Sequence, residues 1–566
     1  RSLFIRRATG LLTDRYVIGS KLGRGAFGEV FTVSLKTDKG DRRVCKRVAR
    51  SQQLVPCEEM QGEVNLLRSL DHPHIIRLFE YFESEDWLDM IIEPVFGGTL
   101  TRLISGMYTK EVKAASSRPK GLTENWIAKA MSQLLSALTY AHDVVGVIHK
   151  DLKPDNVLLV GKPGASVDLQ LKEPVHAMLA DFGIAELFSE RAEPSTDEPM
   201  IAQLSSGLGG ATCGASASQT SRREMRSNRV GGTPPYMSPE MFSGSFNEKC
   251  DMWSLGVILF ELLSGELPYR AENVLTQANL VCNPRRHPPW HRLAKLQWSL
   301  GVRWFCQQLL LKDERERPSA AAAFQDPWLT KLNSAEAAAR PSKQDLLALN
   351  QHHLQSHLMK MATAAVTSQL NLSKLHHLNL TFESYDKSGD GRLSHEEMRA
   401  ILQDIGPQLG DDVELIIEAL DGDRSGSIEY SEFMAGSLDI ASQGVREHLR
   451  VAFELFDLDG SGFLTLGELG RVLTEAPESS GLGSNLLPSA ASGSCGLLPV
   501  GIGRGLVLPD GKTVEEVMEC LDTDGTGKVS FDEFEAYLLK EHEKIGRDLH
   551  RKPQLLKGVA AATAGG

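Results

Sequence analysis

One short stretch combines residue types that could carry out phosphoryl transfer: His149-Lys150-Asp151-Leu152-Lys153-Pro154-Asp155-Asn156. Asp151 supplies a carboxylate that could orient a hydroxyl nucleophile and accept its proton late in the reaction. Lys153 lies two residues further on, where its charge could neutralise a moving phosphoryl group. Asn156 could offer its amide oxygen to Mg²⁺, a hard cation that prefers oxygen ligands. Taken alone, the stretch could also be an ordinary polar loop.

A glycine-rich segment near the start of the chain could cover the phosphates of a nucleotide. Its glycines are Gly23, Gly25 and Gly28, followed by Val30. Glycine suits such a loop because the backbone can approach phosphates without a Cβ in the way. The pattern fits either a turn that opens a helix or a hairpin between two strands. The apolar flanks at 16–18 and 30–33 favour a β-hairpin.

The order of these and other segments resembles that of eukaryotic-type protein kinases. The catalytic loop of that family has the pattern H-R-D-L-x-x-x-N, and its glycine-rich loop ends in a valine. Further matching segments are Val44-Cys45-Lys46, the turn at 71–75, Asp181-Phe182-Gly183, the segment 232–240, the helix start at 251–256, and Arg315-Glu316-Arg317-Pro318. With all of them in order, a chance match is negligible. The resemblance implies a bilobal fold.

The kinase resemblance assigns roles to individual residues. Asp151, Lys153 and Asn156 would form the catalytic loop, and Lys46 would bind phosphates while paired with Glu63 on a helix expected over 56–70. Glu63 could also be an ordinary solvated glutamate. Asp181 and Asn156 would bind Mg²⁺. The expected nucleotide site comprises Gly23, Gly25, Gly28, Val30, Val44, Lys46, Glu93, Val95, Leu158 and Asp181, with Ile92 as gatekeeper and a structural salt bridge elsewhere between Glu240 and Arg317.

Three features depart from the kinase pattern. Lys150 replaces the usual arginine. Bidentate hydrogen bonding to a phosphorylated loop is therefore lost, although the positive charge remains. The segment 184–231 is long and rich in Ser, Gly and Ala, which predicts a disordered host for phosphorylation. Thr99 stands where relatives that favour basic substrates often have Glu, so a preference for arginine upstream of the target hydroxyl is in doubt.

The second half of the chain repeats an acidic loop pattern four times. Calcium loops of the EF-hand type supply oxygens at positions 1, 3, 5, 7 and 9, with Gly at 6 and a bidentate Glu at 12. The expected ligands at positions 1, 3, 5, 7 (backbone carbonyl) and 12 are Asp386, Ser388, Asp390, Arg392 and Glu397; Asp421, Asp423, Ser425, Ser427 and Glu432; Asp457, Asp459, Ser461, Phe463 and Glu468; and Asp522, Asp524, Thr526, Lys528 and Glu533. Hydroxyl ligands lower the loop charge, which favours sensor sites over permanently filled structural ones.

The apolar positions around these loops predict how they pair. Position 8 is apolar in every loop, as expected where two loops form a short strand contact: Leu393, Ile428, Leu464 and Val529. An apolar residue also follows each final glutamate: Met398, Phe433, Leu469 and Phe534. These patterns predict paired EF-hands.

Leu354, Leu358, Met361, Ala362 and Ala365 recur with helical spacing between the two halves and predict an amphipathic helix. This junction helix could be a connector packed on its neighbours. It could also be a switch element, held on the kinase at rest and bound by the calcium lobes when they are loaded.

Kinase, junction helix and EF-hands in this order resemble the calcium-dependent protein kinases of plants and alveolate protists. The resemblance runs from Tyr16 to about Glu541. It implies an α+β protein, a bilobal kinase followed by an all-α calmodulin-like domain, that uses ATP, Mg²⁺ and Ca²⁺ to phosphorylate Ser and Thr in proteins. The expected parts are a leader (1–15), a kinase domain (16–330, with an insertion at about 186–229), a junction (331–372), a calmodulin-like domain (373–545, with an insertion at about 477–509) and a tail (546–566).

Composition limits the compartment and the partners. The chain of 566 residues should hold two or more domains, and its net charge of -13 argues against nucleic acid as the main partner. Eight cysteines without C-x-x-C spacing suit a reducing cytosol. No apolar run reaches transmembrane length, although attachment through residues preceding Arg1 stays open. We expect a cytoplasmic monomer with protein substrates and an intramolecular contact between its two halves.

Two other functions remain open at the level of sequence. One is a calcium-sensing scaffold with an inactive kinase domain, which would require loss of Lys46, Asp151, Asn156 or Asp181; all four are present. The other is a calcium buffer fused to a constitutively active kinase. Kinase activity measured with and without calcium separates these readings.

Overall fold

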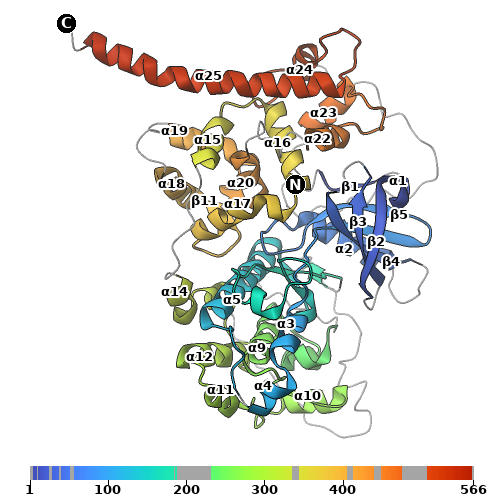
Figure 1. Ribbon diagram of the computed structural model, residues 1–566, viewed down its shortest axis with the longest axis vertical. Helices are drawn as coiled ribbons and strands as arrows, with labels where there is room; N and C mark the ends of the chain where they lie inside the picture. Colours follow the sequence, from blue (N-terminus) through green and yellow to red (C-terminus); the bar gives the residue numbers. More distant parts are fainter. Residues whose placement is uncertain are drawn as a thin grey trace. The chain divides into compact units, whose positions relative to one another are not determined.

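The computed structural model of the chain describes residues 4–8, 10–24, 28–36, 40–50, 57–115, 117–183, 185–187, 231–333, 343–404, 412–438, 448–474 and 507–563 (Figure 1). It divides into two compact units. The catalytic unit comprises Ala8–Ala337 with Ser388–Gly391, and the EF-hand unit comprises Arg1–Arg7, Ala338–Lys387 and Arg392–Gly566. Gly25, residues 188–229 of the predicted loop insertion and residues 477–506 of the second insertion lie outside the described residues.

An antiparallel sheet positions the nucleotide-binding residues of the catalytic unit. Its strands follow the order β5-β6-β4-β3-β2, with bounds β2 (Tyr16–Arg24), β3 (Gly28–Leu35), β4 (Arg42–Ala49), β5 (Leu78–Glu83) and β6 (Trp87–Ile92). The predicted hairpin is confirmed because β2 pairs with β3. Val30 on β3 lies opposite Lys46 on β4, so the loop and the lysine share one end of the sheet. β1 (Arg6–Arg7) and α1 (Leu12–Arg15) precede it, and α2 (Cys57–Ser69) follows β4.

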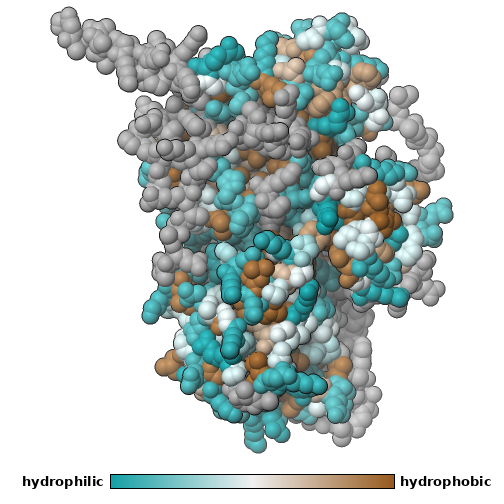
Figure 2. Space-filling model, viewed as in Figure 1, coloured by the Kyte–Doolittle hydropathy of each residue, from teal (hydrophilic) through white to brown (hydrophobic). Residues whose placement is uncertain are grey.

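The edge strand β2 differs from the rest of the sheet in its exposure. A buried cluster on one side includes Tyr16, Val33, Phe79 and Ile91. β2 is exposed after its first residue, although it carries apolar side chains such as Val17 and Leu22. Figure 2 shows hydrophobic surface in the region where Figure 1 places the strands. The outer part of the hairpin therefore contributes little to the core.

Helices dominate the rest of the catalytic unit. Two of them, α5 (Glu124–Thr139) and α9 (Lys249–Ser264), are buried along most of their length. The remaining elements are α3 (Leu100–Met107), α4 (Lys110–Ala115), α6 (Val167–Gln170), α8 (Pro239–Ser243), α10 (Val274–Cys282), α11 (Trp290–Lys295), α12 (Leu300–Leu309), α13 (Ala320–Phe324), α14 (Pro327–Asn333), the short turns η2 (Tyr140–Val145), η3 (Pro154–Asn156) and η4 (Pro234–Tyr236), and the strands β7 (Val147–Ile148), β8 (Val157–Leu159), β9 (Ala177–Leu179) and β10 (Glu186–Leu187). All seven tryptophans of the chain fall between Trp87 and Trp328, within this unit.

The EF-hand unit consists of helix pairs around short loop contacts. Its elements are α15 (Lys343–His352), α16 (His357–Gln369), α17 (Leu372–Tyr385), β11 (Arg392–Ser394), α18 (His395–Asp404), α19 (Asp412–Leu420), β12 (Ser427–Glu429), α20 (Tyr430–Ser437), α22 (Leu449–Phe456), α23 (Leu466–Thr474), α24 (Val514–Leu521) and α25 (Phe531–Thr563). The predicted loop pairing is confirmed: Leu393 lies opposite Ile428, and Leu464 forms a bridge with Val529. The apolar residues that follow the final glutamates (Met398, Phe433, Leu469 and Phe534) are buried.

The junction differs from the single amphipathic helix predicted to begin at Leu354. It contains two helices, and Leu354 lies in the turn between them, about two-fifths exposed (39%). Ser356 begins the second helix, because its side chain caps α16 by accepting a hydrogen bond from Met359 N. The other predicted apolar positions do face the core, with Leu358, Ala362 and Ala365 buried. Helix α16 contacts α20 of the first EF-hand pair and α22 and α23 of the second.

The described helices include none that is both long and apolar enough to cross a membrane.

Candidate functional site

A lysine held between two carboxylates forms the centre of the catalytic site. Lys46 Nζ lies 2.7 Å from Glu63 Oε1 and 2.7 Å from Asp181 Oδ1. Burial favours the neutral amine, but the charges of Glu63 and Asp181 nevertheless hold the pKa of Lys46 above its ordinary value. Burial likewise opposes ionisation of Asp181, and Lys46 outweighs it, so the pKa of Asp181 is lowered. The predicted Lys46–Glu63 ion pair is confirmed.

A second network surrounds Asp151 in the catalytic loop. The ammonium of Lys153 donates to Asp151 Oδ2, and the hydroxyl of Thr233 donates to Asp151 Oδ1 at 2.7 Å. Asn156 Nδ2 donates to the backbone carbonyl of Asp151 at 2.8 Å. Because its amide nitrogen is used in this way, the amide oxygen of Asn156 is the atom that could face a metal. The three predicted catalytic-loop residues are therefore brought together, with Thr233 as an additional member.

Asp251 fixes the backbone that carries the catalytic loop. This fully buried carboxylate accepts hydrogen bonds from the backbone N–H groups of His149 and Lys150, each at 2.9 Å, and from His142 Nε2. Lys150 has a φ of 65°, a left-handed conformation that costs energy for a residue with a Cβ. Such strain persists only when surrounding contacts hold it. Asp251 therefore acts as a positioning residue for the loop.

An aromatic contact and a glycine beside the two networks help to hold the catalytic residues in position. The rings of His149 and Phe182 lie 4.7 Å apart, which joins the catalytic loop to the segment that carries Asp181. Gly232 has a φ of 114°, and a Cβ there would lie 2.6 Å from the carbonyl oxygen of Lys150. Only glycine lets this segment approach closely enough for the adjacent Thr233 to reach Asp151. The predicted Glu240–Arg317 salt bridge is confirmed at 2.6 Å.

The predicted adenine-binding residues include side chains on β4 and β6, two inner strands of the sheet, and on β8. Val44 is buried on β4, Ile92 ends β6, and Leu158 lies on β8. The N–H of Glu93 donates to the carbonyl of Arg77 at 2.9 Å, so any adenine contact from Glu93 would come from its carbonyl oxygen. The side chains of the same two residues form a buried two-pronged ion pair at 2.8 Å. Arg77 thus fixes the start of the hinge, a role that its sequence context did not suggest.

The loops of the EF-hand unit share one hydrogen-bonding pattern. In each, the final glutamate accepts hydrogen bonds from the backbone N–H groups of loop positions 2 and 9, donated by Lys387 and Ser394, Gly422 and Glu429, Leu458 and Thr465, and Thr523 and Ser530. In the later three loops the position-5 hydroxyl donates to the position-7 carbonyl, as in Ser461 to Phe463 at 3.1 Å. In these three loops the ligands expected at positions 5 and 7 therefore lie side by side.

Three loops gather their carboxylates within reach of one cation. The groups are Asp421, Asp423 and Glu432; Asp457, Asp459 and Glu468; and Asp522, Asp524 and Glu533, with one oxygen from each member within 4.8 Å of the others. Calcium with oxygens at about 2.4 Å places opposite ligands about 4.8 Å apart, so these groups fit that ion. The carboxylates of the first loop (Asp386, Asp390 and Glu397) are not among the converging groups of the described residues.

The final glutamates differ in electrostatic environment. Burial raises the pKa of Glu432 to about 8, despite hydrogen bonds from the loop backbone. Hydrogen bonds from Ser530 and Thr523 lower the pKa of the half-buried Glu533 to about 2. Glu432 and Glu533 therefore occupy the same position of the loop pattern but have different proton affinities.

Comparison with known families decides the identity of the catalytic unit. The family described as "Protein kinase domain" matches residues 16–329, more than half of the chain. The chain belongs to the protein kinase family. The family described as "EF-hand domain pair" matches this kinase twice, at residues 376–437 and 446–539. Among the described elements, both lobes and both EF-hand pairs of the expected α+β architecture are present.

The kinase is similar over most of its length to proteins that join the same two parts. Calcium-dependent protein kinase 9 of Oryza sativa subsp. japonica is 29% identical, over 93% of this chain and 77% of the rice protein. Calcium-dependent protein kinase 7 of Arabidopsis thaliana is 26% identical, over 93% and 82%. Calcium-dependent protein kinase 3 of Plasmodium berghei is 26% identical, over 83% and 74%.

Proposed function

We propose that this calcium-activated serine/threonine protein kinase uses Asp151, Lys153 and Thr233 to orient a substrate hydroxyl, and that its EF-hand unit switches this site by binding the junction. The catalytic part of this proposal is supported by two networks of charged and polar side chains. Lys46 pairs with Glu63 and Asp181, and Asp151 pairs with Lys153 and Thr233. A scaffold with an inactive kinase domain would not need both to be intact.

Each network has a distinct task in the transfer. ATP with Mg²⁺ supplies the phosphoryl group and the charge that stabilises its transfer. Lys46 binds the phosphates, and Asp181 and Asn156 offer oxygens to the metal. Asp151 accepts the hydrogen bond of the attacking hydroxyl and takes its proton late, while Lys153 and Thr233 hold the carboxylate in position. Since little covalent chemistry falls to the protein, its contribution is positioning and charge.

The junction supports the proposed switch through its burial inside the EF-hand unit. Leu358, Met359 and Ala362 of α16 are buried there, with contacts to both EF-hand pairs. The N-terminus of α16 is also held by polar groups: Ser356 donates to Glu541 through its N–H at 2.7 Å and its hydroxyl at 2.8 Å. A junction bound in this way is not available to inhibit the kinase. Sensor EF-hands open such apolar grooves when they bind calcium.

The final glutamates of the second EF-hand pair provide the test of calcium control. Replacing Glu468 and Glu533 with Gln should raise the calcium concentration for half-maximal activity on the order of tenfold, because each loop loses a charged bidentate ligand. Activity at saturating calcium should recover. The matched control is Glu519→Gln, which alters an exposed acid of α24 outside the loop. Kinase assays over a calcium series measure the shift; an unchanged calcium requirement in the double variant would contradict the assignment.

A second prediction concerns the long segment after Asp181. We expect activation not to require its phosphorylation, because Lys150 cannot make the two-pronged contact of an arginine with a phosphate. Deletion of residues 195–220 should leave most of the calcium-stimulated activity. The measurement is the specific activity of the deletion variant, and of the full chain after phosphatase treatment. Loss of activity in either case would give loop phosphorylation a necessary role.

We also propose that the kinase acts as a cytoplasmic monomer on protein substrates. Buried free thiols at Cys45, Cys250 and Cys306 are compatible with a reducing compartment. Light scattering of the full chain, with and without calcium, tests the oligomeric state.

A further inference from the structure

Phe4, in the leader that precedes the catalytic unit, is buried in the EF-hand unit. Its exposed fraction is 3%, and that of the adjacent Ile5 is 1%. Phe4 belongs to the same cluster of buried side chains as the junction helix and the second EF-hand pair. A solvated leader would leave such a ring exposed, so Phe4 is part of the core of this unit.

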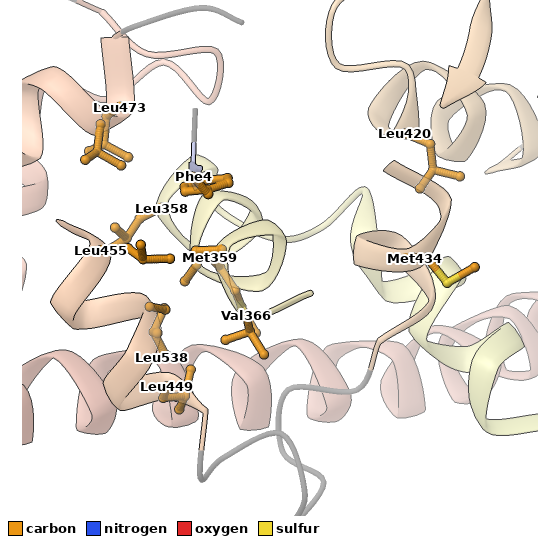
Figure 3. Close-up of a cluster of buried hydrophobic side chains, with 14 of the residues drawn as sticks. Phe4, Leu358, Met359, Val366, Leu420, Met434, Leu449, Leu455, Leu473 and Leu538 are labelled. Carbon is orange, nitrogen blue, oxygen red and sulfur yellow. The ribbon is translucent and has the colours of Figure 1, made fainter. Parts of the chain in front are cut away.

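The ring of Phe4 lies against the third EF-hand. It stacks on Phe456 with ring centroids 6.4 Å apart and an interplanar angle of 24°. Figure 3 shows Leu358 and Met359 of α16, Leu455 of α22 and Leu473 of α23 around it. The site is therefore formed jointly by the junction helix and by the two helices that enter and leave one calcium loop.

The position of Phe456 couples this site to calcium. Phe456 is the last residue of α22, and the next residue, Asp457, is the first ligand of the third loop. Leu473 lies on α23, which follows the final ligand Glu468. Calcium binding to a sensor EF-hand changes the angle between its two helices and exposes an apolar groove. A ring that stacks on the end of α22, within the same buried cluster as Leu473 of α23, is placed to distinguish the closed from the open arrangement of the two helices.

The leader is also anchored at its other end by apolar residues of the catalytic unit. The chain passes from the EF-hand unit to the catalytic unit between Arg7 and Ala8. Leu12 and Tyr16 are buried in the catalytic unit, whereas Leu11, which directly precedes Leu12, is 59% exposed. Only a few residues of the chain therefore separate Phe4, buried in the EF-hand unit, from Leu12, buried in the catalytic unit.

We propose that Phe4 is a second intramolecular ligand of the second EF-hand pair, which binds beside α16 in the groove that calcium opens. This inference rests on the proposed calcium switch and adds a binding site for an aromatic residue of the leader. A ligand that prefers the open pair must raise the affinity of that pair for calcium, and calcium must in turn strengthen binding of the leader. The leader therefore lowers the calcium concentration at which the kinase responds.

The test compares three variants of the full chain over a calcium series. Phe4→Ala removes the ring, Phe4→Leu retains apolar volume, and Leu11→Ala alters an exposed apolar residue of the same leader. Hydrogen exchange of the α22 and α23 amides reports on the third EF-hand, and a kinase assay reports on activity. We expect Phe4→Ala to raise the calcium needed for half-maximal protection of these helices about tenfold. Phe4→Leu should restore much of the wild-type response, and Leu11→Ala should match the wild type.

The outcomes separate this inference from the proposed switch. Unchanged exchange in α9 would show that Phe4→Ala leaves the catalytic unit folded, so that a shift in α22 and α23 reports on the site itself. If Phe4→Ala matched the wild type in both assays while the wild type responded to calcium, the leader would be no ligand and the inference would be wrong. If the wild type itself showed no calcium response, the proposed switch would fail first. Equal losses in Phe4→Ala and Leu11→Ala would also overturn the inference, because the effect would not depend on the buried ring.

Discussion

Replacement of Asp181 with Ala should lower the rate of phosphotransfer by about two to three orders of magnitude or more. The variant loses a carboxylate that lies 2.7 Å from Lys46 and that is the charged ligand proposed for Mg²⁺. Lys46→Met should have a similar effect, because it removes the shared partner of Glu63 and Asp181. The loss should appear in kcat, since these groups stabilise charge during the transfer rather than only binding the nucleotide.

Calcium binding is the control for this prediction. The two units have separate hydrophobic cores, so calcium titration of Asp181→Ala should match that of the wild type. Lys162→Met provides a matched lysine variant, because the side chain of Lys162 is 78% exposed and belongs to neither network. It should retain normal turnover. Near-normal turnover in Asp181→Ala would remove the basis for the magnesium assignment.

A chain that ends after Asn333 should be active without calcium. This truncation leaves the last helix of the catalytic unit, α14, intact and removes the junction and the EF-hands. If the junction inhibits the kinase at rest, its removal releases the site. A hundredfold difference between resting and activated chains corresponds to about 2.7 kcal/mol of coupling, which several calcium sites can share. Activity in the presence of a calcium chelator is the measurement.

A longer truncation distinguishes inhibition by the junction from activation by the EF-hands. A chain that ends after Leu370 retains α15 and α16 but no calcium loop. It should stay inactive at any calcium concentration, because nothing can withdraw the junction from the kinase. If instead the chain ending after Asn333 were silent and only the full chain were active, the EF-hand unit would have to activate the kinase directly.

The sequence was sufficient to predict the contacts of residues that are recognised by their type and spacing. The two ion pairs predicted from the kinase resemblance, Lys46–Glu63 and Glu240–Arg317, both form. The loop pairings also follow from the sequence, because an apolar residue at position 8 can pair only with its equivalent in a neighbouring loop.

Other features depend on contacts between residues far apart in the chain, and sequence did not reveal them. Arg77 reaches Glu93 only because β5 and β6 are neighbours, and Thr233 reaches Asp151 only because Gly232 permits the approach. The break in the junction was missed because apolar spacing continues across it, although Ser356 followed at N3 by Met359 caps a new helix. Phe4 has no periodic neighbours, so no local pattern indicated that it would be buried.

The confinement of all seven tryptophans to the catalytic unit has a practical optical consequence. The EF-hand unit contains no indole, so calcium entering its loops cannot change tryptophan emission from within that unit. Any change in tryptophan emission must therefore originate in the part of the chain that performs catalysis. Intrinsic fluorescence is therefore a label-free reporter of the catalytic unit, because a calcium-dependent change in emission records a change around its tryptophans.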